Sequence, residues 1–167
     1  MAREKGFSLI ELLIVVAIIL VIAAIAIPDM LKSRQAANQA SAVGSMRTLN
    51  TAEVTYASTY NTGYSFTLMD LGGTGPVATI TNAELIDDVL ASGIKSSYHF
   101  YYVACPTTPG PNSGGMGNGA CTYVANYQIS ANPLGAATGL SYYTDASGVI
   151  RRNISAPAGP NDSPIGN

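Results

Sequence analysis

Few residues of this chain could do chemistry, and one of them lies where acids are rare. Glu11 is the only ionisable side chain between Phe7 and Ile27, and the sixteen residues from Leu12 onward to Ile27 carry no polar side chain. A charged side chain in such a surrounding is costly, so an acid there is by default a functional residue that needs a partner. The alternative is that Glu11 lies near the end of a membrane helix and reaches the lipid headgroups.

The remaining reactive residues form no catalytic or metal-binding pattern. His99 has no serine or cysteine nucleophile in a recognisable context, and the glycine-rich segment 115–120 is followed by a cysteine and not by the helix that a dinucleotide loop requires. Asp145 could help to bind calcium, but only Ser147 and backbone carbonyls are close to it in sequence. We therefore expect no catalytic residue, no cofactor and no metal ion.

The two cysteines, Cys105 and Cys121, bracket a segment rich in proline, glycine, serine and asparagine. A single disulfide in an oxidising compartment is the expected arrangement. In the chain-entropy model, closing a loop of about fifteen residues contributes on the order of 3 kcal/mol. Free thiols or a metal are the alternatives, although one histidine is a poor supply of further zinc ligands.

The apolar run that contains Glu11 is long enough to cross a membrane. As a helix, residues 7–27 would span about 31 Å, close to the thickness of the hydrocarbon core. A secretory signal peptide is the alternative, but it has a shorter apolar core and a cleavage site after that core. Arg3 and Lys5 precede the run, so the positive-inside rule predicts a cytoplasmic N-terminus and an external C-terminal domain.

Beyond the apolar run, the helix is expected to continue to about Tyr60. Pro28 removes a backbone donor and should kink or locally unwind the helix near Ala24. Further along, apolar residues recur at helical spacing and predict a face that packs on a sheet. These residues are Ala42, Met46, Leu49, Ala52, Tyr56 and Tyr60.

The second half of the chain predicts a small antiparallel sheet. Alternating patterns predict strands at residues 97–104 and 122–130, and residues 140–152 resemble a hairpin with its turn at 145–148. With the long helix, three or four strands give an α+β fold.

A short helix is expected between the long helix and the sheet. Thr81-Asn82-Ala83-Glu84 has the pattern of a capping box, which would open a helix ending near Ala91, with Gly93 as its C-terminal stop.

Charge and composition exclude some classes of function. Only 11% of residues are charged and the formal net charge is −2, so no basic face for nucleic acid is expected. The abundance of small and uncharged polar residues suits an extracellular surface that packs beside copies of itself.

The first thirty residues resemble a known family. Lys5-Gly6-Phe7-Ser8-Leu9-Ile10-Glu11-Leu12 is similar to the class III signal of type IV pilins and pseudopilins, and Pro28 occupies a position where these pilins usually have proline. The resemblance implies that a prepilin peptidase cuts between Gly6 and Phe7 and methylates the new amine of Phe7. Glu11 would then pair with the Phe7 amine of a neighbouring subunit and set the register of subunit addition.

The resemblance further implies a pilin fold and a structural role without enzymatic activity. The protein is expected to be a major type IV pilin, which polymerises through its helix into an extracellular pilus. Such a pilus would serve adhesion, twitching motility, DNA uptake or surface attachment. Before assembly it would be a single-pass inner-membrane protein, with the prepilin peptidase, the inner-membrane assembly platform, minor pilins and other copies of itself as partners. The expected parts are a leader at 1–6, a long helix at 7–60 with its membrane and fibre-core portion at 7–27, a head domain at 61–155 and a flexible tail at 156–167.

Two alternatives remain open at this point. A pseudopilin of a type II secretion system or a minor pilin would share the same N-terminus. A membrane-tethered binding module would instead keep its first residues.

Overall fold

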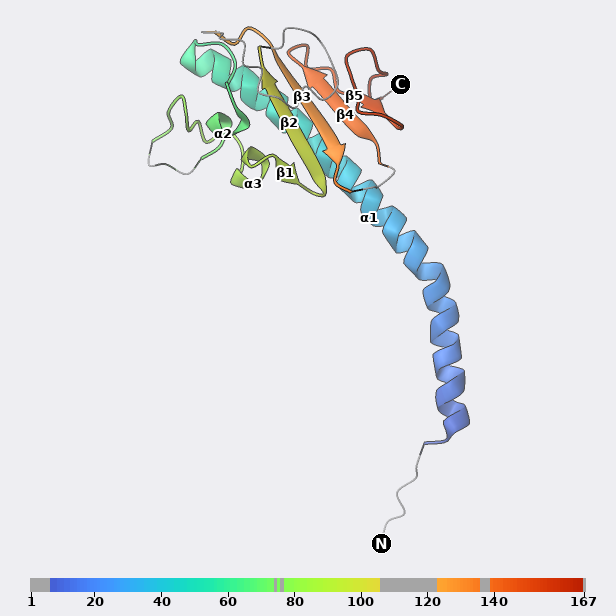
Figure 1. The fold of residues 1–167 in the computed structure, drawn as a ribbon. Coiled ribbons are helices and arrows are strands. Elements are labelled where there is room, and N and C mark those ends of the chain that lie inside the picture. The colour runs from blue at the N-terminus through green and yellow to red at the C-terminus, as the bar shows by residue number, and fades with distance from the viewer. Residues whose placement is uncertain (1–6, 74, 76, 106–122, 136–138, 167) are drawn as a thin grey trace. The chain divides into compact units, whose positions relative to one another are not determined.

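The computed structural model describes residues 7–73, 75, 77–105, 123–135 and 139–166 (Figure 1). Its elements follow the order α1 (Leu9–Tyr60), α2 (Leu68–Leu71), α3 (Asp88–Ala91), β1 (Ile94–Lys95), β2 (Tyr98–Ala104), β3 (Tyr127–Pro133), β4 (Ser141–Asp145) and β5 (Arg151–Asn153). The chain divides into two compact units, Met1–Ala37 and Asn38–Asn167, and α1 contributes to both.

The five strands form one antiparallel sheet in the order β1-β2-β3-β4-β5. The central pair, β2 and β3, is in register from Tyr98 opposite Pro133 to Ala104 opposite Tyr127. Because side chains alternate across a strand, this register places Phe100 beside Ala131 on one face of the sheet. The predicted α+β class, a long helix and an antiparallel sheet, is confirmed.

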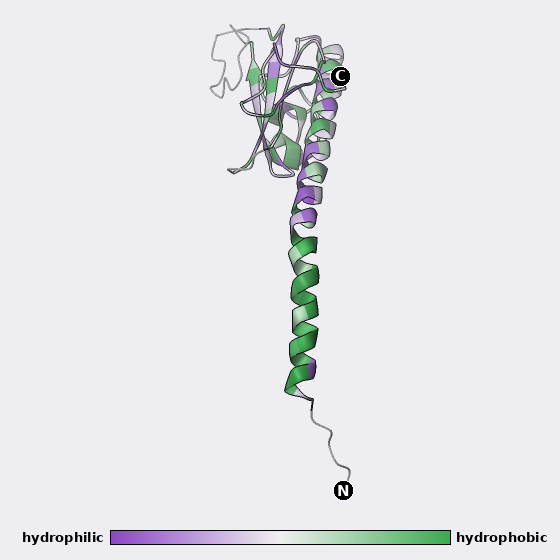
Figure 2. Ribbon diagram, turned by 90° about the vertical axis from the view of Figure 1, so that its right-hand side faces the viewer, coloured by the Kyte–Doolittle hydropathy of each residue, from purple (hydrophilic) through white to green (hydrophobic). Residues whose placement is uncertain are grey.

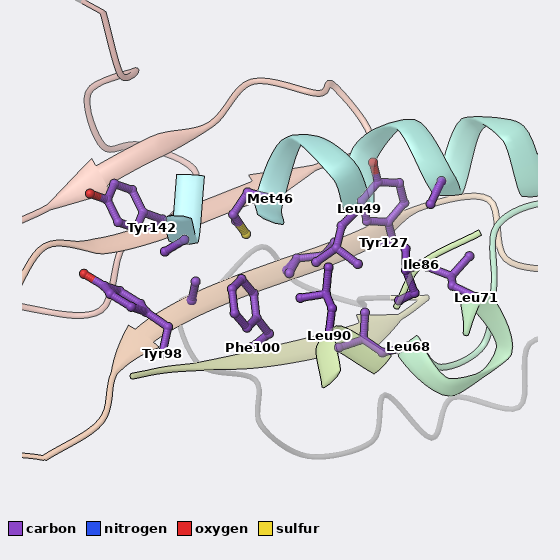
Figure 3. Close-up of a cluster of buried hydrophobic side chains, with 14 of the residues drawn as sticks. Met46, Leu49, Leu68, Leu71, Ile86, Leu90, Tyr98, Phe100, Tyr127 and Tyr142 are labelled. Carbon is purple, nitrogen blue, oxygen red and sulfur yellow. The ribbon is translucent and has the colours of Figure 1, made fainter. Parts of the chain in front are cut away.

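The second half of α1 covers the inner face of this sheet (Figure 1). Five residues of the predicted apolar stripe are almost fully buried, and Tyr60 packs against them: Ala42, Met46, Leu49, Ala52 and Tyr56. Figure 3 shows how Met46 and Leu49 lie over the side chains of the strands and of the short helices. The stripe is therefore the helix side of the core.

Strands β2, β4 and β5 lie where the alternating patterns predict them, but β3 is displaced. It begins at Tyr127 and not at residue 122, and it runs on to Pro133. Upstream of it, Val124 forms an isolated bridge with Gly63 and accepts a hydrogen bond from the Tyr64 backbone (2.9 Å). The residues just before β3 are thus hydrogen-bonded to the segment that follows α1.

The predicted capping box at Thr81 is wrong. Helix α3 begins only at Asp88, and the side chain of Asp87 caps it by accepting from the Leu90 backbone (3.2 Å). The capping box of this region lies earlier, where Thr67 and Asp70 exchange reciprocal bonds at the start of α2. After Thr81, the amides of Ala83, Glu84 and Leu85 donate to the carbonyls of Asp70, Gly72 and Leu71, so this segment bonds to the α2 region instead of forming a helix.

Residues 156–166 lie along the free edge of β5. The Arg152 amide donates to the Ser163 carbonyl (3.0 Å), and the Ile165 amide donates to the Ile150 carbonyl (2.9 Å). Ala158 is completely buried. The sequence predicted a flexible tail at 156–167, and these contacts place residues 156–166 beside β5.

Candidate assembly site

The first half of α1 exposes a continuous apolar surface. Each large apolar side chain from Phe7 to Leu31 leaves between 46% and 83% of its surface exposed, and Figure 2 shows this part of the helix as almost entirely hydrophobic. The helix is long and apolar enough to cross a membrane. Exposed apolar surfaces of this extent mark sites that lipid or other protein chains cover.

Glu11 interrupts this surface in the first turn of the helix. The first intrahelical bond runs from the Leu12 amide to the Ser8 carbonyl (3.3 Å), which makes Ser8 the capping residue. The Ser8 amide donates to Oε2 of Glu11 (3.0 Å). Glu11 therefore makes one of the two bonds of a capping box within its own chain, a contact that was not predicted from the sequence.

This local bond does not use up the acceptor capacity of the carboxylate. An ionised carboxylate has two oxygens and about four acceptor sites. The Glu11 side chain is exposed, so its remaining capacity is open to a group from outside the chain. In an apolar surrounding, the group that would best stabilise it is a cation with donors to share.

Further along, Pro28 lies inside α1, and the helix continues past it to Tyr60. The predicted kink near Ala24 stays a prediction. Asp29 and Lys32 approach to 3.9 Å, but both side chains are more than 70% exposed, so this pair contributes little to stability.

Two residues of the predicted sites, Gly6 and Cys121, lie outside the described residues. The predicted disulfide therefore stays a prediction. Its other member, Cys105, directly follows β2 and has a positive φ of 50°.

The side chains weighed for other chemistry have structural surroundings. The His99 ring packs edge-on against that of Tyr101, with centroids 4.0 Å apart. Asp145 accepts from the Ser147 amide (2.9 Å) and so shapes the predicted hairpin turn. Over the described parts of the chain, no three His, Cys, Asp or Glu side chains gather as metal ligands would.

A polar network that sequence reasoning missed ties α1 to the sheet. Asn50 accepts from the Tyr127 hydroxyl (3.0 Å), and both of its amide atoms lie within 3.3 Å of Thr144 Oγ1. Its amide nitrogen also donates to the Gly148 carbonyl (3.2 Å) in the hairpin turn. One helix residue thus holds strands β3 and β4 and the turn after β4.

The second missed residue is Glu53, an acid that is 0% exposed. It accepts from both the amide (2.9 Å) and the hydroxyl (2.7 Å) of Ser65. Burial raises the pKa of its carboxyl, and the hydrogen bonds from Ser65 oppose that rise. The signal was present in the sequence, because Glu53 lies four residues after Leu49, on the face of the apolar stripe.

Comparisons with known proteins agree with the N-terminal pattern. Residues 1–27 match the family model described as the prokaryotic N-terminal methylation motif. The chain is 46% identical over 56 residues to a type IV major pilin protein, PilA, of Myxococcus xanthus, a match that covers 34% of this chain and 26% of that protein. It is 58% identical over 38 residues to the type IV wide pilus major component PilA4 of Thermus thermophilus, covering 23% of this chain and 29% of that protein.

These matches are partial. The chain spans between about a quarter and a third of the length of the curated relatives it matches. No solved structure matches it. The resemblance to type IV pilins is nevertheless confirmed, because the methylation motif and both relatives point to that family.

Proposed function

Because a methylation motif leads directly into an exposed apolar helix, we propose that this chain is a major type IV pilin, a structural subunit without catalytic activity. The observation that carries the proposal is the continuity of the two features: the motif covers residues 1–27, and α1 begins at Leu9 within it. A membrane anchor alone would not need the motif, and a soluble domain would not need the helix.

In this proposal the chain is first an inner-membrane protein with a cytoplasmic N-terminus. A prepilin peptidase removes residues 1–6 by cutting between Gly6 and Phe7, and the amine of Phe7 is methylated. The assembly platform and minor pilins then draw the subunit into an extracellular pilus. The apolar half of α1 serves as a membrane anchor before assembly and as the core of the fibre afterwards.

The transfer from membrane to fibre gives Glu11 its proposed role. Lipid tails are as apolar as leucine side chains, so the hydrophobic effect does not favour the fibre core over the membrane. Close packing and polar pairs must therefore supply the preference, and Pro28 is proposed to adapt the helix to that packing. An ionised Glu11 and the Phe7 amine of a neighbouring subunit each need an oppositely charged partner in such a core.

Two substitutions of Glu11 separate the proposed pairing from the local cap. Glu11→Gln keeps an oxygen that can accept from the Ser8 amide but cannot neutralise an ammonium, whereas Glu11→Ala removes both functions. We expect both variants to be inserted and processed but to form few or no fibres. Asp29→Asn, at an exposed acid of the same helix, is the matched control and should form fibres normally.

Fibre yield in sheared material, compared with the amount of processed subunit in the membrane, measures the effect. Normal fibre yield from Glu11→Gln would show that the charge is not needed and that the capping role is sufficient. If Glu11→Gln formed fibres and Glu11→Ala did not, helix capping and not intersubunit pairing would explain the acid.

The nearest alternative is a pseudopilin or minor pilin with the same N-terminus. If sheared material contained long fibres composed mainly of this chain, that result would favour the major pilin, because the alternatives build short or tip structures. The names of both relatives, a major pilin and a major pilus component, support the same choice.

The head domain would form the outer surface of the fibre, with the predicted Cys105–Cys121 disulfide fixing one of its loops. Adhesion, motility or DNA uptake would follow from the fibre as a whole.

A further inference from the structure

A buried acid joins α1 to the segment that follows it. Glu53 lies in the last third of α1, and Ser65 lies in the connection between α1 and α2; both residues are 0% exposed. The Glu53 carboxyl accepts from the Ser65 amide and from the Ser65 hydroxyl. The hydroxyl of Tyr102, on β2, donates to the Ser65 carbonyl (2.7 Å), so three polar groups of one serine are fixed.

No cation accompanies this acid. Among the described residues, no Lys, Arg or His forms an ion pair with Glu53. The titratable groups that face it are Asp70 from the start of α2, Tyr102 from β2, Tyr127 from β3 and Tyr56 from its own helix. All of them are neutral or negative at neutral pH, so none compensates a buried negative charge.

The geometry accommodates a proton on Glu53 without losing a hydrogen bond. Ser65 Oγ lies 2.7 Å from Glu53 Oε1 and 3.2 Å from the Tyr102 hydroxyl. A protonated Glu53 carboxyl can therefore donate to the Ser65 hydroxyl, and the Ser65 hydroxyl can donate to the Tyr102 hydroxyl. The Tyr102 hydroxyl already donates to the Ser65 carbonyl. Each hydroxyl then donates once, and the cluster contains no charge.

When Glu53 is ionised, Ser65 donates to it instead, and the hydrogen bonds are again satisfied. The two states therefore differ chiefly in the buried charge. Desolvation disfavours that charge, and it ceases to do so when the connection opens to water. Residues beside Ser65 have further anchors, since the Tyr64 amide donates to the Val124 carbonyl (2.9 Å) and the Tyr64 ring packs edge-on against that of Tyr127.

From this arrangement we infer that Glu53 and Ser65 form a proton-sensitive latch, closed when the carboxyl is protonated and loosened when it ionises, which controls how firmly residues 61–67 are held on α1. The inference concerns the head domain alone and does not depend on the proposed pilin function.

The sign of the effect follows from linkage. Because burial raises the pKa of Glu53 above its ordinary value of 4.5, the closed latch gains stability that is fully present below pH 4.5. That stability is lost as the pH rises through the folded-state pKa. The equilibrium between closed and open latch then shifts by about tenfold for each pH unit that separates the two pKa values.

The test uses the full chain in detergent micelles, with the glutamate carboxyls labelled with carbon-13. The titration of Glu53 is followed by NMR between about pH 4 and pH 9, and the exchange protection factor of the Ser65 amide is measured over the same range. The amide of Phe100, which donates to the Gly93 carbonyl, is the internal reference. We expect Glu53 to titrate above 4.5 and the protection of Ser65 to fall as it does, while that of Phe100 stays constant.

Three variants complete the test. Glu53→Gln imitates the protonated acid and should abolish the pH dependence at Ser65. Glu84→Gln makes the same change at an exposed acid that accepts from the Gly75 amide, and it should leave the latch as in the unmodified chain. Ser65→Ala removes a hydrogen bond that stabilises the charged form, so it should raise the pKa of Glu53 further.

The inference is overturned if Glu53 titrates at or below 4.5. It is equally overturned if the protection of Ser65 falls with pH as steeply in Glu53→Gln as in the unmodified chain. Should Glu53→Gln fail to fold, the carboxyl titration in the unmodified chain and in Ser65→Ala decides the matter, and an unchanged or lowered pKa in Ser65→Ala contradicts the latch.

Discussion

Replacing Asn50 should destabilise the head domain through the hydroxyls it leaves behind. Asn50→Ala removes the acceptor of the Tyr127 hydroxyl and both amide partners of Thr144. Tyr127 is 1% exposed and Thr144 is 0% exposed, so both hydroxyls lose their partner at buried positions. An unsatisfied buried hydroxyl costs about 1–3 kcal/mol, and because the smaller Thr144 hydroxyl can rotate, we expect a total loss of about 2–4 kcal/mol.

Two comparisons isolate this cause. Thr51→Ala, on the neighbouring exposed position of α1, makes a similar change in helix propensity and should alter the free energy of unfolding by less than about 0.5 kcal/mol. Tyr127→Phe should cost about 1 kcal/mol alone but little or nothing in the Asn50→Ala background, because the orphaned hydroxyl is then absent.

Urea unfolding of the full chain in detergent, followed by near-ultraviolet circular dichroism of the tyrosines, measures these differences. The reasoning fails if Asn50→Ala changes the free energy of unfolding no more than Thr51→Ala does. It also fails if the losses from Asn50→Ala and Tyr127→Phe simply add, because that result would mean the two groups do not depend on each other.

The same unfolding assay tests two further expectations. Leu49→Ala, at a fully buried core position, should lower the free energy of unfolding by about 3–5 kcal/mol through lost contacts and a residual cavity. The control is Val54→Ala, at a 62% exposed position. If Leu49→Ala cost no more than this control, the core assignment would be contradicted. Lys95→Ala removes the 2.8 Å ion pair that lowers the pKa of Asp87, and since both side chains are about a third or more exposed, it should cost less than about 1 kcal/mol at pH 7. A lowered folded-state pKa of Asp87 gives stability that is present above pH 3.8 and lost as the pH falls through the folded value. The difference in the free energy of unfolding between Lys95→Ala and the unmodified chain should therefore shrink in acid. A difference that grew in acid would refute the assigned sign.

The elements that sequence reasoning predicted are those with a strong local pattern. The apolar stripe from Ala42 to Tyr56 repeats at helical spacing, and the alternation of Tyr98 and Phe100 marks a strand, so both were assigned to the correct elements. The hairpin between β4 and β5 was also predicted, from the run of turn residues at 145–148, and in the structure Gly148 has a positive φ of 72°.

What sequence reasoning missed depends on contacts between distant segments. The start of β3 is set by Val124, which engages the segment after α1 across about sixty residues of chain. The choice between the capping patterns at Thr67 and Thr81 is made by tertiary packing, since both have a suitable acid three residues later.

The candidate site likewise has features that the local sequence predicts and features that it does not. Glu11 was singled out from the sequence as an unusual acid, because its neighbours in the chain are apolar, and its role in assembly stays a prediction. Its bond to the Ser8 amide was not foreseen, although the Ser-x-x-Glu spacing is a capping pattern. Glu53 was overlooked although its position four residues after Leu49 places it on the face of the apolar stripe, whereas its hydrogen bonds to Ser65 join segments that no local pattern relates.

The central claim is that this chain is processed at Gly6 and assembled into fibres. Mass spectrometry of intact subunits from sheared fibres of the native source tests both parts in one measurement. The account predicts that the main fibre protein is this chain beginning at Phe7 and carrying one added methyl group on its amine. A chain that begins at Met1 or Ala2, or fibres from which this chain is absent, would contradict it.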